Sequence, residues 1–151
     1  MSALKSRLES DLRDAMKSRD ELVTSTLRMA IAAVRTAEVA GKQARELTDD
    51  EVLGVLTKEA KKRREAATAF SDAGRTESAE KELAEEQIIT RYLPAQLSDE
   101  EIATIVAYAL SASGFTTMAQ MGPAMKAAQT AVAGRAEGGR VAAEVRRQLS
   151  G

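Results

Sequence analysis

The sequence contains no cysteine and no histidine. These absences exclude disulfide bonds, thiol nucleophiles, zinc sites of the Cys/His kind and imidazole acid–base chemistry. Aromatic residues make up only 3% of the chain, so a core must be formed by aliphatic side chains and methionine. The net charge is −1, so no overall field draws the chain toward nucleic acid, and a polyanion site must come from local clustering of cations.

Apolar runs are short throughout, and none approaches the roughly 20 residues that a membrane helix needs. The N-terminus also lacks the apolar segment of a secretory signal. Together with the absence of cysteine, these features favour a cytoplasmic protein with no membrane association.

Proline is scarce as well, and only Pro94 and Pro123 interrupt the chain. Apolar residues recur at steps of three and four without strand-like alternation, which predicts an all-α fold. Four helices are expected before Pro94: around Leu4–Met16, between Ser18 and Gly41, between Thr48 and Gly74, and from about Thr76 to Tyr92. Capping boxes at Ser18–Glu21 and Thr48–Glu51 are predicted to start the second and third.

Pro94 marks the expected domain boundary, because it cannot donate an amide and favours an extended residue before it. Three helices are expected after it: one from a capping box at Ser98–Glu101, one from near Thr117 or Met121, and one from near Gly139. The sequence thus predicts a four-helix domain over residues 1–94 and a three-helix domain over residues 95–151. On the fourth helix, Leu83 and Ile89 are expected to face the core, whereas Ile88 and Tyr92 are expected to point elsewhere.

The densest cluster of cations consists of Lys58, Lys61 and Lys62, followed directly by Arg63 and Arg64. The three lysines share one helix face. At about 100° per residue they lie on the face opposite the apolar positions of the third helix, which gives a basic stripe able to contact phosphates. The alternative is an ordinary solvated helix face, with the repulsion between the lysines relieved by Glu65.

Arg63 is placed by the same periodicity among apolar residues, where an unpaired charge is costly. We expect a structural ion pair between the third and fourth helices, with Glu59, Glu82 or Glu86 as the partner. On this hypothesis, replacing Arg63 with methionine leaves folding nearly intact.

The glycine-rich segment Gly134–Arg140 precedes the last predicted helix. Its glycines permit close approach of the backbone, and the helix N-terminus after it favours anions. Lys126, Arg135 and Arg140 are therefore candidate phosphate contacts. The alternative is a plain connection with a glycine cap.

Catalytic motifs are missing. The carboxylate clusters at Asp49–Glu51 and Asp99–Glu101 are explained by helix starts, and Glu85–Glu86 by an acidic helix surface. The sequence has no GxSxG elbow, no Ser-x-x-Lys and no phosphate-binding loop. We expect no catalytic residues, no metal site and no cofactor.

Several short motifs, each weak by itself, follow one another along the chain. They are Leu27-Arg28-Met29, Leu47–Glu51, Lys62–Glu65, Gly74-Arg75, Glu82–Glu86, Tyr92-Leu93-Pro94, Met121-Gly122, Met125-Lys126, and Gly134–Gly138 with Val141, Val145 and Leu149. The ordered set resembles the GatB/YqeY-domain proteins and the tail of the B subunit of tRNA-dependent amidotransferases. Two positions depart from the pattern: Pro123 stands where a helix-forming residue is expected, and Gly139 where a basic residue is expected.

The resemblance implies that this chain corresponds to the helical and tail parts of the subunit. The tail is the part implied to touch the outer corner of tRNA, whereas a larger cradle domain holds the ATP-dependent activation chemistry and a separate subunit hydrolyses glutamine. We therefore expect an accessory RNA-binding module, with tRNA or another structured RNA as partner and recognition of shape and backbone, because aromatics for base stacking are few. The alternatives are an adaptor for translation or amidotransferase proteins, docking through exposed Ile88, Tyr92 and Phe115, and a component of a glutamine-dependent carbon–nitrogen ligase.

Overall fold

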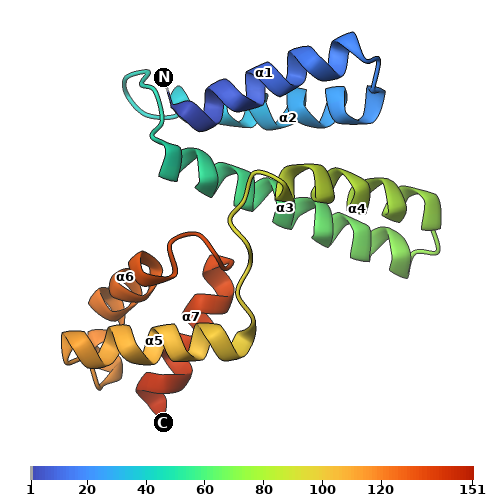
Figure 1. The fold of residues 1–151 in the computed structure, drawn as a ribbon. Coiled ribbons are helices and arrows are strands. Elements are labelled where there is room, and N and C mark those ends of the chain that lie inside the picture. Colours follow the sequence, from blue (N-terminus) through green and yellow to red (C-terminus); the bar gives the residue numbers. More distant parts are fainter. Residues whose placement is uncertain (1) are drawn as a thin grey trace. The chain divides into compact units, whose positions relative to one another are not determined.

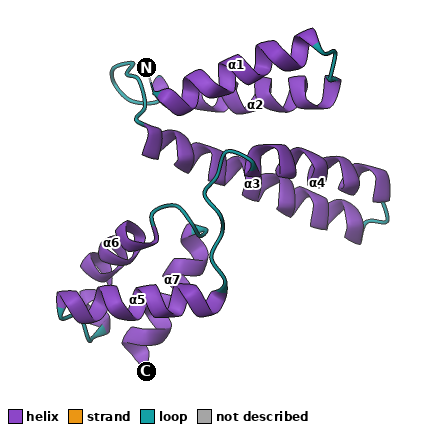
Figure 2. Ribbon diagram, viewed as in Figure 1, coloured by secondary structure: helices purple, strands orange, loops and turns teal. Residues whose placement is uncertain are grey.

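The computed structural model describes residues 2–151, and within this range every regular element is helical (Figures 1 and 2). The elements are α1 (Ala3–Lys17), α2 (Glu21–Glu38), α3 (Asp49–Asp72), α4 (Thr76–Thr90), α5 (Asp99–Ser113), the 3₁₀ turn η1 (Met118–Gln120), α6 (Met121–Val132) and α7 (Gly138–Ser150). The predicted all-α fold is confirmed. Contacts group the chain into a first unit that ends at Leu93 and a second unit over Pro94–Gly151, and each is described by itself.

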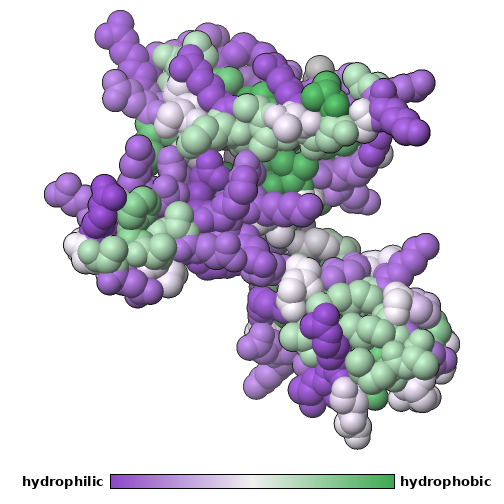
Figure 3. All heavy atoms as spheres, turned by 180° about the vertical axis from the view of Figure 1, so that it is seen from behind, coloured by the Kyte–Doolittle hydropathy of each residue, from purple (hydrophilic) through white to green (hydrophobic). Residues whose placement is uncertain are grey.

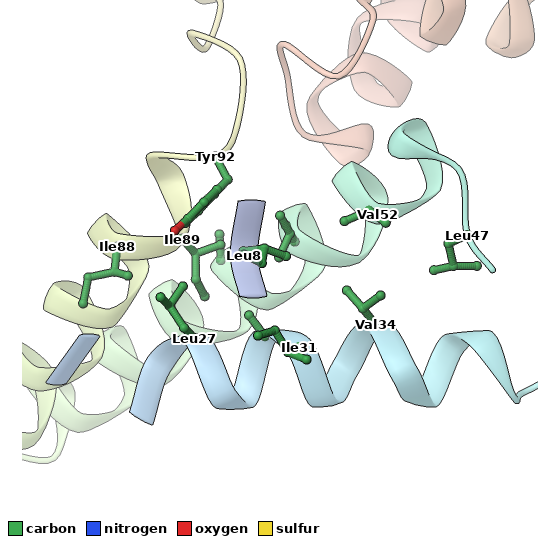
Figure 4. Packing of buried hydrophobic residues seen from close by; sticks show 12 residues of the cluster. Leu8, Leu27, Ile31, Val34, Leu47, Val52, Ile88, Ile89 and Tyr92 are labelled. Carbon is green, nitrogen blue, oxygen red and sulfur yellow. The ribbon is translucent and has the colours of Figure 1, made fainter. Parts of the chain in front are cut away.

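The first unit consists of two helical hairpins, α1–α2 and α3–α4 (Figure 1). Its core gathers around α2, where Leu27, Ile31 and Val34 point toward α3 and α4 (Figure 4). Each of these side chains is almost fully buried, which stabilises the fold by roughly 1.5–3 kcal/mol apiece. The helices of this unit are therefore held mainly by aliphatic packing, as the scarcity of aromatic residues requires.

Helix starts follow local chemistry. Thr48 Oγ1 accepts the amide of Glu51 at 3.3 Å and Glu51 Oε1 accepts the amide of Thr48 at 3.1 Å, so the predicted capping box at α3 is confirmed. A hydrogen-bonded ion pair with Arg45, together with the Thr48 amide, lowers the pKa of Glu51 to about 2. The same box starts α5 at Ser98.

The predicted capping box at Ser18 is wrong. Ser18 ends α1, and Asp20 caps α2 by accepting the amide of Val23 at 3.1 Å. Arg19, between them, has a φ of 59°, which turns the chain within three residues. A helix therefore ends where the sequence pattern expected one to begin.

The buried face of α4 also differs from expectation. Ile88 and Tyr92 lie in the core of the first unit, whereas Leu83, expected to be buried, is 45% exposed. The buried positions of α4 are Ala79, Glu85, Ile88 and Ile89, and the Glu85 carboxylate lies 3.8 Å from buried Arg63 on α3. Two of the three docking residues predicted for an adaptor are thus unavailable, and the third, Phe115, packs half-buried against the core of the second unit.

The second unit is a three-helix arrangement of α5, α6 and α7 around Val106, Ala128 and Val145. Pro123 is the third residue of α6, where its missing amide is not needed, so α6 begins at Met121. Gly114, with a φ of 74°, ends α5 in the left-handed region that glycine adopts without strain.

Across residues 2–151, no single helix is long and apolar enough to cross a membrane; one pair, Asp99–Ser113 with Met118–Val132, meets the length and composition test together but is bent by 92°.

Candidate functional site

The predicted basic stripe lies on α3. Lys58 is exposed and has no ion-pair partner within residues 2–151. Lys61 Nζ lies 3.9 Å from Glu65, and Lys62 Nζ lies 3.3 Å from Glu59, with the Lys62 side chain 72% exposed. The Lys61–Glu65 pair is exposed, and exposed pairs contribute about 0–1 kcal/mol. Glu59 is mostly buried and also lies beside Arg63, so the Lys62 ammonium group shares this carboxylate while it reaches into solvent.

Hydrophilic side chains cover much of one face of the molecule, with hydrophobic residues in patches between them (Figure 3). On such a surface a cation is a useful binding group only where it is not already engaged by its own chain. The contacts of each candidate cation therefore decide whether it can reach a phosphate.

Arg63 is buried, with only 7% of its surface exposed. Its Nη1 donates to the Glu59 carbonyl at 3.0 Å and lies 3.5 Å from the Glu59 carboxylate, while Nε lies 3.8 Å from Glu85. No hydrogen-bond acceptor reaches Nε within the described chain. The arrangement is a buried charge cluster between α3 and α4, closed to external ligands.

The α4 partner of Arg63 is Glu85, which sequence reasoning missed. Glu86 instead lies 3.6 Å from Arg64. Burial raises the pKa of Glu85, and neighbouring Glu82 raises it further, while Arg63 opposes both. Glu85 precedes the buried pair Ile88–Ile89 by three and four residues, so counting back from those residues would have placed it on the buried face.

The Gly134–Arg140 segment uses its two arginines internally. Arg135 donates from Nε to the Val132 carbonyl at 2.9 Å and from Nη2 to the Ala131 carbonyl at 3.1 Å, which caps the end of α6. Arg140 Nη2 donates to the Leu97 carbonyl at 3.1 Å and to Asp99 Oδ1 at 2.7 Å. Both guanidinium groups hold the second unit together.

Lys126, the third candidate of the second unit, lies exposed on α6. Its side chain forms no hydrogen bond or ion pair within residues 2–151. Arg135 and Arg140 thus both contact Leu97: the Arg135 carbonyl accepts the Leu97 amide, and the Arg140 side chain donates to the Leu97 carbonyl. Lys126 takes no part in these hydrogen bonds.

A further basic surface escaped the sequence analysis. A groove of about 310 Å³ between α1 and α2 is lined by Arg13, Arg28 and Arg35, with Glu9 as its only acidic lining residue among those described. The three arginines lie far apart in the sequence and form no local charge run. The seven-residue spacing of Arg28 and Arg35, two turns of one helix face, is the signal that could have indicated it.

Tyr92 closes a second groove, of about 420 Å³, within the first unit. Its hydroxyl donates to Asp11 Oδ2 at 2.5 Å, and the Arg7 guanidinium lies 4.6 Å from its ring centre. Burial, and then the contact with Asp11, raises the pKa of Tyr92. Three aspartates, Asp11, Asp14 and Asp20, face two arginines, Arg7 and Arg91, in the lining of this groove, so its charge does not favour anions.

Comparison with known proteins decides the family. The family model for Yqey-like proteins matches residues 5–149. The chain belongs to the YqeY-like family. The resemblance to GatB/YqeY-domain proteins is therefore confirmed. No group of three or more acidic residues suited to hold a metal ion occurs between residues 2 and 151.

Two relatives align with about two thirds of this YqeY-like chain. An uncharacterized protein from Schizosaccharomyces pombe is 37% identical over 97 residues, which is 64% of this chain and 76% of that protein. The protein named "Altered inheritance of mitochondria protein 41, mitochondrial" from Clavispora lusitaniae is 32% identical over 102 residues, 66% of this chain and 58% of that protein. The aligned segment thus spans little more than half of the second relative.

Proposed function

We propose that this YqeY-like protein is an accessory RNA-binding module that contacts the phosphate backbone of a structured RNA, with tRNA as the first candidate. The observation that carries the proposal is the lysine surface of α3, where Lys58 is exposed and the Lys62 side chain is 72% exposed, with the half-exposed Lys61 beside them. An ammonium group that reaches solvent exchanges a neighbouring carboxylate for phosphate at low cost.

In this proposal the second unit contributes one phosphate contact, where the sequence suggested three. Arg135 and Arg140 donate to backbone carbonyls, so phosphate binding by either would break contacts that shape the unit. Lys126 carries no such commitment and is the phosphate contact proposed there. The amidotransferase tail provides the reason to choose tRNA as the partner, through the resemblance of the motifs.

The location is proposed as the cytoplasm, on the composition alone. The name of the Clavispora relative places that protein in mitochondria, so an organelle is the competing location. Neither location changes the chemistry of phosphate binding, because both contain tRNA.

The experiment is filter binding of tRNA at a series of salt concentrations. Lys58→Gln/Lys62→Gln removes two cations without removing helix-forming side chains. If both contact phosphate, the slope of log K against log salt falls in magnitude by about 1.4–1.8. Lys17→Gln/Lys42→Gln removes the same charge from exposed positions outside the stripe and serves as the control.

Equal weakening by both double variants indicates a general charge effect and contradicts a specific α3 surface. Equal affinity of the native protein for tRNA and heparin removes the tRNA-specific form of the proposal. A lack of binding even at low salt removes RNA binding itself.

A further inference from the structure

We propose that the groove between α1 and α2 is a phosphate-binding site formed by Arg13, Arg28 and Arg35. This site is separate from the α3 lysine surface. The phosphate could be supplied by an RNA backbone, in which case the inference rests on the proposed function, or by a free polyphosphate. The shared chemistry is a forked guanidinium contact with phosphate oxygens.

The register of the α1–α2 hairpin places the three arginines around one opening. Arg35 Nη2 lies 3.7 Å from Glu9 Oε1, which aligns these two positions across the antiparallel pair. One turn further along both helices, Arg13 then lies opposite Ile31. Arg28 and Arg35 are seven residues apart, or about 10 Å along the helix axis. Arg13 therefore faces the interval between them from the other helix.

These guanidinium groups are available for binding. Arg13 and Arg28 have no ion-pair partner within residues 2–151. Arg35 forms its ion pair with Glu9, adds a weaker charge interaction with Glu38, and has a side chain that is 67% exposed. Arg135 and Arg140 are less available for a ligand, because their N–H groups already donate to carbonyl oxygens of the chain. The groove carries three positive charges against one negative charge in a chain whose net charge is −1.

The floor of the groove is aliphatic, formed in part by Leu12 and buried Ile31, with Met16 at one end. Such a floor offers no hydrogen bonds, so a ligand's polar contacts must come from the arginine rim. A volume of about 310 Å³ is small for a ligand site. A peptide helix, about 10 Å across with its side chains, does not fit inside it. A phosphate group does, which favours phosphate over an acidic helical peptide.

The test uses the full chain and residue-resolved NMR titrations with inorganic tripolyphosphate, alongside filter binding of tRNA. The variant Arg13→Gln/Arg28→Gln keeps good helix formers at exposed positions. The control Lys17→Gln/Lys42→Gln removes the same charge outside the groove. We expect tripolyphosphate to shift amide signals of α1 and α2, and the arginine variant to weaken tripolyphosphate binding at least about fivefold while the control changes it less than twofold.

The charge of the groove can also be changed in the opposite direction. Glu9→Gln removes the one acidic lining residue described and releases Arg35 from its weak pair. We expect tripolyphosphate affinity to rise, by up to about fivefold, since an exposed pair of this kind is weak. Unchanged or lower affinity in this variant contradicts the assigned role of the rim.

The outcomes separate the groove from the proposed function. Tripolyphosphate dependence on the arginines without any binding of tRNA supports the groove with free phosphate as its source and removes the RNA proposal. Dependence of both ligands on the arginines supports RNA as the source. Equal tripolyphosphate binding by the arginine variant and the control, or shifts confined to other helices, overturns the groove even where tRNA binds. Tighter and more arginine-dependent binding of a poly-glutamate peptide than of tripolyphosphate contradicts the choice of phosphate.

Discussion

Arg63→Met breaks the buried charge cluster between α3 and α4. Glu85, with 5% of its surface exposed, then has no cationic partner on α3, and its burial is already unfavourable to the ionised form. Removing one member of a buried pair costs about 3–5 kcal/mol. We therefore expect a destabilised methionine variant, whereas the sequence, read without Glu85, led to the expectation that folding stays nearly intact or improves.

Replacing Arg63 together with Glu85 gives the opposite result. Arg63→Met/Glu85→Leu exchanges these two charges for apolar side chains of similar size, and Glu59 keeps Lys62 as a partner at 3.3 Å. We therefore expect stability within about 1 kcal/mol of the native protein, or higher. The matched control is Arg64→Met, because the Arg64 side chain is 51% exposed and lies 3.6 Å from Glu86 across the same two helices. Solvent screens the Arg64 charge, so we expect a loss of about 1 kcal/mol.

The pH dependence has a definite sign. The raised pKa of Glu85 means that the folded state binds this proton more tightly than the unfolded state does. The contribution of Glu85 to the free energy of unfolding is therefore full below the ordinary pKa of a glutamate, and it is lost as the pH rises through the raised pKa. Arg63 is the one residue of α3 whose charge lowers the pKa of Glu85, so its loss raises that pKa further. The penalty of Arg63→Met is therefore larger at pH 7 than at pH 5.

Urea titrations followed by residue-resolved NMR measure the first unit separately from the second, which a whole-chain signal does not. A penalty of 3–5 kcal/mol corresponds to a melting shift of at least about 12 °C for a unit of this size. Equal losses for Arg63→Met and Arg64→Met would refute the buried-pair account. So would a double variant as unstable as Arg63→Met alone.

Two other contacts give predictions of stability. Tyr92→Phe removes the hydrogen bond to Asp11, which costs about 1 kcal/mol, measured by the same urea titration of the first unit; no loss of stability contradicts a contribution from this contact. Arg140→Gln removes the hydrogen bonds to Leu97 and Asp99, and we expect it to lower the stability of the second unit by about 1–3 kcal/mol. Lys126→Gln is expected to change that stability by no more than about 0.5 kcal/mol. Amide exchange in α5–α7 measures both. Equal effects of these last two variants contradict a structural role for Arg140.

Local chemistry explains which parts of the fold could be predicted from sequence. The capping boxes at Thr48 and Ser98 depend on residues three apart, so the sequence contains all the information needed. At Ser18 the same pattern fails because Asp20 is a competing cap two residues later, and the left-handed Arg19 between them lets the chain turn. A motif identifies a possible helix start, and competition among neighbouring residues decides which one is used.

Long-range contacts explain the errors at the candidate sites. On α4, Ile88 and Ile89 pack in the core, Glu85 lies inward beside Arg63 of another helix, and Leu83 is exposed. The fate of Arg140 depends on Leu97, 43 residues earlier, and could not be inferred from the glycine-rich segment itself. The arginine groove likewise needs the register of two helices. Residue type and periodicity indicate which side chains are cationic, but tertiary contacts decide which remain available.

The most direct measurement of the central claim is the salt dependence of tRNA binding by the native full chain. Four phosphate contacts predict that log K falls with log salt with a slope of about −2.8 to −3.6, depending on whether the RNA is single- or double-stranded at the contact. Tight binding with a slope near zero would contradict phosphate contact, and no binding at low salt would contradict RNA binding altogether.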